Sequence, residues 1–375
     1  MAGIYLHIPF CKSRCIYCDF YSQTDETYID EFTEAVCREA HLRKQMLENE
    51  TVRTIYFGGG TPSRLQEKHL EKIFDTLFAE FSMNNLAEVT LEANPDDLSP
   101  EYIGMLRRLP FNRISIGIQS FNDDELKFLG RRHTSHDAVK AVKNSQQMGF
   151  DNISIDLMYG LPAQTPEIWQ NNLQQACALD IQHISAYHLT YEENTPLYGL
   201  LKKGKIHPVD EELSSTFFNQ LIDTLEEEGF VHYEISNFAK PGYLSQHNSS
   251  YWKGDTYLGL GPSAHSFDGH NRSWNTASLT AYLKGVFTGN MSCETEHLSL
   301  LQHYNEFILT RLRTRDGIDT LELKNRFGES LYRYCLDGAQ KFIEEGLLVF
   351  QNNVLKLTRK GMFISDGIIS ELMKV

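Results

Sequence analysis

Short apolar, β-branched runs recur along the first half of the chain, and segments with helical spacing separate them. In one such segment Ile29, Phe32 and Val36 fall on one helical face. The predicted strands are 3–10, 54–60, 88–94, 113–119, 152–160 and 183–190. Strands that alternate with helices favour parallel pairing and right-handed crossovers. Six such units predict an α/β fold in which the sheet curls into an incomplete (α/β)6 parallel barrel.

The pattern changes near residue 298. Residues 298–375 read as amphipathic helices, then two strands joined at Gln351–Asn353, then one closing helix. Helices followed by a hairpin predict a C-terminal helical, winged-helix-like domain. The chain is therefore divided into a barrel core at 1–195, an intervening segment at 196–297 that completes the core, and this domain. A helix is expected near 211–228.

Glycines and polar residues lie late in the predicted strands. They are Gly58–Gly60 with Thr61, Glu92, Gln119, Asp156 and His188. In a parallel barrel the carboxyl ends of all strands open onto one face, where active sites form. A single such residue would be read as a strand cap. Several on one rim predict a functional site.

Three cysteines follow the first strand in "CKSRCIYCDF", and Phe20 stands where a fourth could be. A closed zinc site needs four ligands. His7 is the available fourth, so a zinc-stabilised binding module stays open as a hypothesis. An iron–sulfur cubane is held by thiolates on its irons. With three thiolates, one iron is left open for another molecule, which makes a cluster reactive.

Composition narrows the choice of function. The chain has 375 residues, of which 41% are hydrophobic, and a formal net charge of −15, which argues against non-specific nucleic-acid binding. No apolar run is long enough to span a membrane, and "MAGIYLHIPF" is not a signal peptide. The other four cysteines are isolated, which suits a reducing cytosol. We therefore expect a soluble, cytoplasmic protein that binds no nucleic acid.

The spacing C-x3-C-x2-C after a first barrel strand, with an aromatic residue before the last cysteine, resembles the signature of the radical S-adenosylmethionine (SAM) superfamily. The motif "GGGTP" resembles the second motif of that superfamily. The segments "SIGIQSF", "LGRRH", "DLMYGLP" and "YLGLGPSAHS" extend the resemblance to the anaerobic coproporphyrinogen III dehydrogenase (oxidase-like) family. This resemblance runs from Tyr5 to Ser266.

The resemblance implies a set of cofactor contacts. Cys11, Cys15 and Cys18 would hold a [4Fe–4S] cluster. Tyr5, Gly59 and Glu92 would contact SAM on the open iron. The resemblance also implies that a second SAM would be surrounded by Tyr17, Gly60, Thr61, Gln119, Arg131 and Asp156. Whether the chain uses this second position is left open. Glu92 and Asp156 can accept hydrogen bonds from ribose or ammonium, and Arg131 can pair with a carboxylate.

Two departures separate the chain from the dehydrogenase. That enzyme has a fourth cysteine where Phe20 stands, and a long N-terminal extension where only four residues precede Tyr5. The pattern C-x3-C-x2-C-x-F resembles instead the heme chaperone branch, called HemW, which also has an HNxxYW motif. Here the motif comprises His247, Asn248, Tyr251 and Trp252.

The HNxxYW motif reads as a loop and suits heme. Histidine is a common axial ligand of heme iron, and Tyr and Trp offer flat apolar faces. A loop of core aromatics with a surface histidine is the plainer interpretation. His265 is a second histidine for which heme binding and packing stay equally open.

The main expectation is therefore a heme chaperone that binds a [4Fe–4S] cluster, SAM and heme, and delivers heme to respiratory heme proteins. Transient contact with a membrane protein is compatible with that role. The alternative is an oxygen-independent coproporphyrinogen III dehydrogenase, which oxidatively decarboxylates its substrate with a deoxyadenosyl radical. The departures named above favour a chaperone without this dehydrogenase activity.

Overall fold

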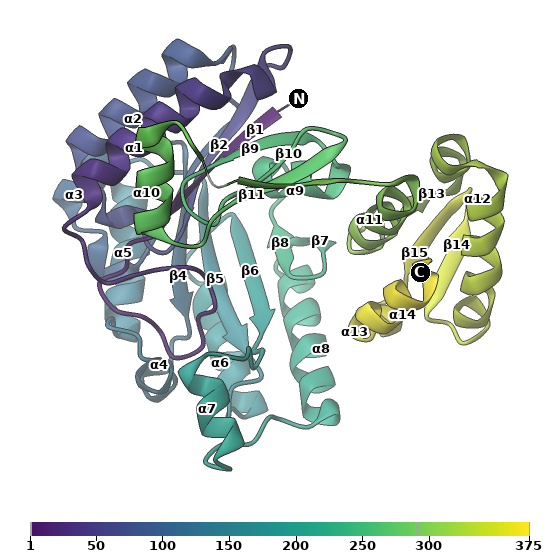
Figure 1. The fold of residues 1–375 in the computed structure, drawn as a ribbon. Helices are drawn as coiled ribbons and strands as arrows, with labels where there is room; N and C mark the ends of the chain where they lie inside the picture. The colour runs from purple at the N-terminus through teal and green to yellow at the C-terminus, as the bar shows by residue number, and fades with distance from the viewer. Residues whose placement is uncertain (1, 292, 375) are drawn as a thin grey trace.

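The computed structural model describes residues 2–291 and 293–374, and a curved parallel sheet forms its centre (Figure 1). Its first six strands are β1 (Ala2–Ile8), β2 (Val52–Gly59), β3 (Glu88–Ala93), β4 (Arg113–Gln119), β5 (Ile153–Tyr159) and β6 (His183–His188). They pair in parallel in this order. The six predicted strands and their parallel pairing are confirmed.

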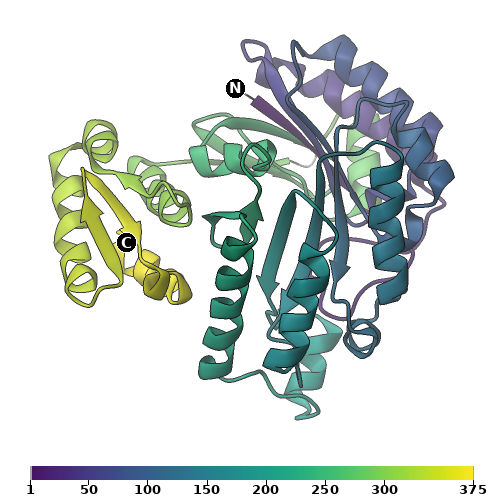
Figure 2. The same ribbon diagram turned by 180° about the vertical axis from the view of Figure 1, so that it is seen from behind.

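Helices return the chain from each strand to the next and cover the outer face of the sheet, as Figures 1 and 2 show. They are α1 (Ile29–Arg43), α2 (Glu67–Glu80), α3 (Pro100–Leu106), α5 (Ser135–Gln147), α6 (Pro166–Cys177) and α8 (Glu211–Glu227). Helices α4 (Asp123–Leu129) and α7 (Pro196–Lys202) lie instead at the carboxyl ends of the strands. Short 3₁₀ helices are η1 (Lys44–Leu47), η2 (Pro62–Arg64) and η3 (Pro95–Asp97). The outward side chains form the apolar core, where Ile4, Leu6 and Phe57 are fully buried.

The sheet extends beyond both ends of the predicted barrel. Strand β9 (Thr256–Leu260) pairs in parallel with β1, and β10 (His265–Phe267), β11 (Asn271–Asn275) and β12 (Cys293–His297) continue that edge in antiparallel fashion. At the other end β8 (Asn237–Ala239) and β7 (Val231–Glu234) follow β6. Helix α10 (Leu279–Thr288) packs on α1. The strand order of this sheet runs from β12 to β7, which gives an incomplete barrel.

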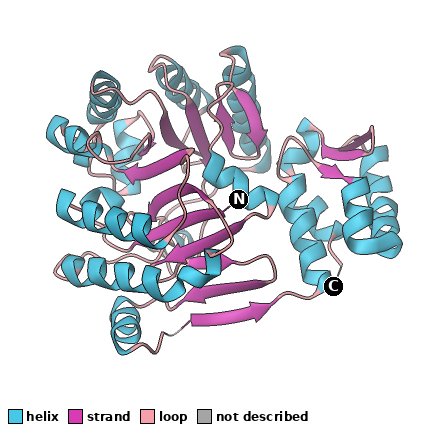
Figure 3. Ribbon diagram, turned by 90° about the horizontal axis from the view of Figure 1, so that it is seen from above, coloured by secondary structure: helices cyan, strands magenta, loops and turns pink. Residues whose placement is uncertain are grey.

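The C-terminal part packs around a core of its own, set to one side of the barrel (Figures 1 and 3). Its elements are α11 (Leu300–Leu312), β13 (Ile318–Asp319), α12 (Thr320–Glu344), β14 (Leu348–Gln351), β15 (Val354–Leu357), α13 (Arg359–Phe363) and α14 (Ser365–Leu372). Gly328 interrupts α12 with a φ of 81°. The winged-helix-like prediction is confirmed, but the closing helix is two helices, α13 and α14.

The hairpin of this domain turns at two asparagines in the left-handed region. Asn352 has a φ of 53° and Asn353 a φ of 62°. Two such residues form the turn whose twist matches that of the flanking strands, and asparagine tolerates it well. The prediction of two strands joined at Gln351–Asn353 is therefore confirmed.

The HNxxYW motif is a helix, α9 (Gln246–Lys253), and the loop interpretation was wrong. The Ser245 hydroxyl accepts a hydrogen bond from the Asn248 amide, which caps the helix. The Glu88 carboxylate accepts from the Gln246 amide at 2.7 Å and from the His247 amide at 3.3 Å. Glu88 lies on β3, so a distant acidic side chain satisfies the free amides of this helix.

None of the helices in residues 2–291 and 293–374 is both long and apolar enough to cross a membrane.

Candidate functional site

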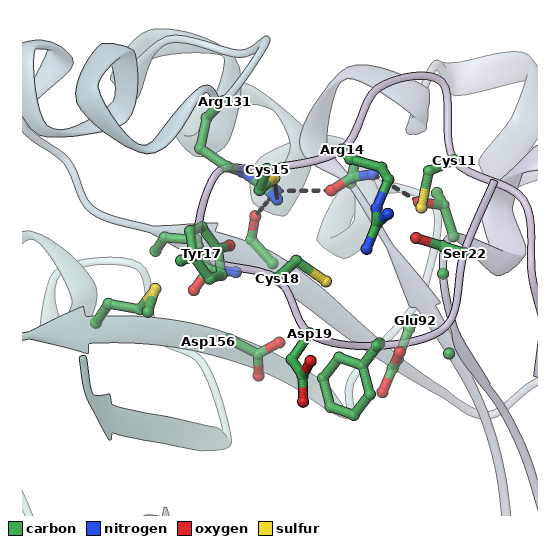
Figure 4. Close-up of a pocket in the computed structure, with 18 of the residues that line it drawn as sticks. Cys11, Arg14, Cys15, Tyr17, Cys18, Asp19, Ser22, Glu92, Arg131 and Asp156 are labelled. Carbon is green, nitrogen blue, oxygen red and sulfur yellow. Dashed lines mark hydrogen bonds between the residues drawn. The ribbon is translucent and has the colours of Figure 1, made fainter. Parts of the chain in front are cut away.

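The carboxyl ends of the barrel strands and the loop after β1 enclose a cavity of about 570 Å³, which we call the mouth cavity (Figure 4). The predicted residues that line it are Cys11, Cys15, Tyr17, Cys18, Gly59, Gly60, Thr61, Glu92, Gln119, Arg131 and Asp156. The structure therefore brings together the three cysteines and most of the residues predicted to contact SAM. Strand ends that are distant in sequence meet here because parallel strands present their carboxyl ends on one face.

Backbone hydrogen bonds join the two ends of the cysteine loop. The Cys11 amide donates to the Gln23 carbonyl at 2.8 Å, and the Gln23 amide donates to the Pro9 carbonyl at 2.7 Å. Cys11 is buried, whereas Cys15 and Cys18 are partly exposed at the rim. All three side chains line the mouth cavity.

Two of the sulfurs accept hydrogen bonds from other motifs. The Thr61 hydroxyl donates to Cys11 Sγ at 3.3 Å, and the Arg131 guanidinium donates to Cys15 Sγ at 3.4 Å. Burial raises the pKa of the Cys11 and Cys18 thiols. Donors directed at sulfur stabilise the thiolate form, which is the form that binds metal.

In the described ranges no three His, Cys, Asp or Glu side chains are grouped to hold one metal ion. A cubane differs from a single ion, because each of its thiolates binds a separate iron and the ligands stand farther apart. Three sulfurs on one loop, with hydrogen-bond donors beside them, fit such a cluster.

Glycines at the end of β2 make room for the cysteine loop. Gly59 has a φ of +103°, and a β-carbon there would lie 2.8 Å from the His7 ring. A β-carbon on Gly60 would lie 2.8 Å from the Ile8 carbonyl oxygen and 3.1 Å from Cys11 Sγ. Only glycine satisfies both the backbone conformation at 59 and the close approach at 60.

Two partly buried carboxyl groups line the mouth cavity. The Tyr56 hydroxyl donates to Glu92 Oε1 at 2.7 Å, and burial raises the pKa of Glu92 to about 7. The Ser115 hydroxyl donates to Asp156 at 3.4 Å, and burial raises the pKa of Asp156 to about 6. A cationic ligand would restore the ionised form of both groups, because an opposite charge offsets the loss of hydration.

Hydrogen bonds fix Arg131 beside the cysteine loop, and Gln119 has an unusual backbone conformation at the end of β4. The Arg131 guanidinium donates to Asn94 Oδ1 at 2.6 Å and to the Gly117 carbonyl oxygen. Gln119 has a φ of 71°, next to an irregularity in the β4–β5 pairing. A strained backbone held by its surroundings is typical of functional sites.

The cavity also contains residues that the sequence reasoning missed. Asn94, Ser115 and Tyr187 line it. Asn94 and Tyr187 lie at strand ends, so the same positional rule could have found them. Arg113, also missed, is a fully buried cation on β4 near Glu88 and Asp156. Nothing in the local sequence marks its burial.

His247 lies in the barrel interior and is only 1% exposed. Its Nδ1 pairs with the Thr54 hydroxyl at 2.8 Å and its Nε2 with the Tyr251 hydroxyl at 2.8 Å. Burial lowers the pKa of His247 to about 3, so the ring is neutral. Both nitrogens already have partners, and neither His247 nor Asn248 lines the mouth cavity or the cavity described next.

A second cavity, of about 600 Å³, lies between the barrel and the C-terminal domain, and we call it the interdomain cavity. Tyr251 and Trp252 of the HNxxYW motif line it, together with Tyr5 and His265. Tyr5 was predicted to contact SAM, but it lines this cavity, with its hydroxyl 3.3 Å from His7 Nδ1. Phe20 lines both cavities and is 68% exposed.

Replacement of His247 with alanine is expected to lower the free energy of unfolding by about 2–4 kcal/mol, because it leaves a cavity and removes the hydrogen-bond partner of the buried Thr54 hydroxyl and of the Tyr251 hydroxyl. Urea denaturation of the purified protein measures the change. The control is His270→Ala, which removes an exposed histidine. An unchanged denaturation midpoint for His247→Ala would contradict the structural role.

Two family models match the chain: the radical SAM superfamily over residues 5–176 and the HemN C-terminal domain over residues 298–364. The heme chaperone HemW of Bacillus subtilis is 32% identical over 376 residues, which cover 100% of this chain and 99% of that protein. The chain belongs to the HemW family of radical SAM proteins. The resemblance seen in the sequence motifs is thus confirmed at the level of the family.

Other similar proteins support the same family assignment. Lactococcus lactis HemW is 33% identical over 371 residues, covering 98% of this chain and 96% of that protein. A mitochondrial radical S-adenosyl methionine domain-containing protein 1 from Danio rerio is 30% identical over 395 residues, which cover 99% of this chain and 87% of that protein. The solved structure of coproporphyrinogen III oxidase (HemN) from Escherichia coli superposes with a TM-score of 0.86 at 21% identity, covering 100% of this chain and 90% of that one. That likeness shows a shared fold.

Proposed function

We propose that this chain is a cytoplasmic heme chaperone that holds a [4Fe–4S] cluster, binds SAM at the open iron and passes heme to respiratory heme proteins. The observation that carries the proposal is the pair of adjoining cavities. The mouth cavity has three thiols and two partly buried carboxyl groups, and the interdomain cavity has aromatic and basic side chains. Phe20, the residue in place of a fourth cysteine, contributes to both.

The mouth cavity suits the cluster and SAM. Cys11, Cys15 and Cys18 would each bind one iron, and SAM would occupy the fourth. When bound, the cluster and SAM supply one-electron chemistry. SAM carries a sulfonium and an ammonium, so the ionised forms of Glu92 and Asp156 would stabilise it. The residues predicted around a second SAM line this same cavity, so the two SAM positions share one space.

The interdomain cavity suits a flat, apolar and dianionic ligand. Its volume of about 600 Å³ is within the usual range of ligand pockets. Tyr251 and Trp252 offer aromatic surface, and the Trp252 indole N–H has no hydrogen-bond partner among the described residues. Tyr251 and Trp252 would therefore contact heme, whereas His247 and Asn248 would support the helix that carries them.

A heme-transfer experiment tests the proposal. Anaerobically reconstituted protein loaded with hemin is mixed with a heme-free respiratory b-type cytochrome, and the two are separated. We expect the absorption spectrum of the holo-cytochrome to appear, and transfer to fall when Cys15→Ala removes a cluster ligand. No transfer above that from hemin-loaded serum albumin would contradict the chaperone role.

The same preparation tests the alternative enzyme. Incubation with SAM, a strong reductant and coproporphyrinogen III is expected to yield no protoporphyrin fluorescence after oxidation. Multiple turnovers that Cys15→Ala abolishes would instead establish the dehydrogenase activity.

A further inference from the structure

Two separate parts of the fold form the walls of the interdomain cavity. One wall is the face of β9, β10 and β11 that carries Tyr257, His265 and Phe267. His265 and Phe267 are two residues apart on β10, so their side chains project from the same face. The other wall is α11, which contributes His303 and Phe307, and the two walls meet where the His303 ring lies 6.4 Å from the Phe267 ring. Aromatic rings therefore line both sides of the space.

Three histidines line this cavity, and they differ in how their ring nitrogens are used. His7 is buried, with Nε2 2.8 Å from the Tyr21 carbonyl oxygen and Nδ1 3.3 Å from the Tyr5 hydroxyl. Neither ring nitrogen of His265 or His303 forms a hydrogen bond to any other described residue. A histidine whose two ring nitrogens are both hydrogen-bonded must break one of these bonds before it can bind a metal. A histidine with free ring nitrogens can bind a metal directly.

Of the two histidines without hydrogen-bonded ring nitrogens, His265 is the one whose backbone and ring are held by close neighbours. Its ring stacks on Trp274, with the centroids 5.8 Å apart and the planes at 26°. Ser263, two residues before it, has a φ of 65°. A β-carbon on Gly259 would lie 2.0 Å from the His265 carbonyl oxygen, so glycine is required there. The turn at Ser263 and the close approach of Gly259 thus fix the backbone that carries the exposed His265 imidazole.

Basic side chains flank the aromatic rings. Arg272, Arg311 and Arg326 line the cavity. Arg272 pairs with Glu306 at 2.8 Å, whereas Arg311 and Arg326 share Glu322, at 3.3 and 3.1 Å. Three guanidiniums thus have two carboxylates between them. Each guanidinium has five N–H donors, so several remain for an added carboxylate.

We propose that His265 is the protein ligand to heme iron, with the porphyrin in the interdomain cavity beside the contact between Phe267 and His303, and with its propionates on the arginines of the C-terminal domain. This assignment rests on the proposed heme chaperone function. It places the iron ligand on β10 and gives the HNxxYW motif a supporting role. Because α11 supplies one wall, heme also joins the barrel to the C-terminal domain.

Hemin titration of the cluster-loaded full-length protein tests the assignment, with the Soret band and ferric heme EPR as readouts. His265→Ala is expected to lower hemin affinity at least tenfold and to change the iron spin state. Added imidazole should restore the wild-type spectrum of His265→Ala, which a purely structural effect would not allow. The control is His270→Ala, an exposed histidine on the adjoining turn that does not line the cavity, and it should behave as wild type.

A second arm tests the propionate contacts. Arg326→Gln is expected to weaken hemin binding several-fold and to leave binding of hemin dimethyl ester unchanged, because the ester lacks the carboxylates. Equal losses for hemin and its ester would overturn this part of the proposal.

The outcomes separate the ligand from the function. Wild-type hemin binding with an unchanged spectrum in His265→Ala overturns His265 and leaves the chaperone function standing. Loss of the spectrum in His303→Ala but not in His265→Ala moves the ligand to α11 and also overturns it. If wild-type protein binds no hemin, the proposed function itself fails.

Discussion

Simultaneous replacement of Cys11, Cys15 and Cys18 with alanine is expected to give a protein that folds but holds no iron. Wild-type chain reconstituted without oxygen should carry about four irons and four sulfides. The triple variant should carry almost none, since no other residues in the mouth cavity offer three thiolates. Addition of SAM should perturb the EPR spectrum of the reduced wild-type cluster, and the variant should give no such signal.

The fold should survive this change because the loop is held by its backbone. The Cys11 amide and the Gln23 amide form the contacts that fix its ends, and alanine retains them. Cys15 and Cys18 are partly exposed, so only the loss of the buried Cys11 sulfur should cost stability, by about 1 kcal/mol. Circular dichroism and urea denaturation measure this.

The chain offers a matched control. Cys37, Cys177 and Cys293 are also partly exposed, but they lie on α1, α6 and β12, away from the mouth cavity. Their joint replacement with alanine should leave iron content unchanged. Iron retained by the loop variant, or lost from the control, would refute the assignment of the cluster ligands.

The barrel could be read from the sequence because its signals are local. Each of the first six strands is a short run rich in β-branched residues, and segments with helical spacing separate these runs. The alternation of strands and helices predicts parallel pairing. The same holds for the hairpin at Asn352 and Asn353, where two adjacent asparagines mark the turn. The rim of the mouth cavity followed from the rule that parallel strands open at their carboxyl ends.

Other features depend on contacts between residues far apart in the chain. Strand β9 pairs with β1, about 250 residues away in sequence, and no local pattern shows this. Helix α9 lacks an apolar periodicity, and Glu88, which satisfies its first amides, lies 158 residues before Gln246. The sequence therefore could not show that His247 is enclosed and already paired.

The interdomain cavity is the clearest case of this limit. It exists only because α11 packs against α9 and faces the β9–β11 strands. Residues such as His303 and Arg326 come from the C-terminal domain, where their surroundings in sequence resemble those of any solvent-facing helix. Only the docking of two parts, each with its own core, brings these side chains beside Trp252.

Replacement of Glu92 with glutamine is expected to weaken SAM binding at least about tenfold at pH 8, a loss of about 1.4 kcal/mol or more. Glu92 is a partly buried carboxyl group whose pKa is raised to about 7, mainly by loss of hydration. A cationic ligand favours its ionised form, so binding by wild-type protein should strengthen as pH rises from 6 to 8. Isothermal titration at several pH values should show this dependence, and Glu92→Gln should largely remove it.

Stability without SAM should change in the opposite direction. The pKa of Glu92 is near 4.5 in the unfolded chain and about 7 in the folded one, so the folded state holds the proton more tightly. Stability is therefore lost as pH rises from about 4.5 to about 7, by up to about 3 kcal/mol. Glutamine cannot ionise, so Glu92→Gln should be more stable than wild type at pH 8 and nearly equal to it at pH 4.5.

The control Glu227→Gln removes an exposed carboxylate and should alter neither SAM binding nor stability. A Glu92→Gln protein that is less stable than wild type at pH 8 would show that the carboxylate stabilises the fold. Greater stability together with weaker SAM binding would mean that Glu92 destabilises the folded protein and is needed for ligand binding.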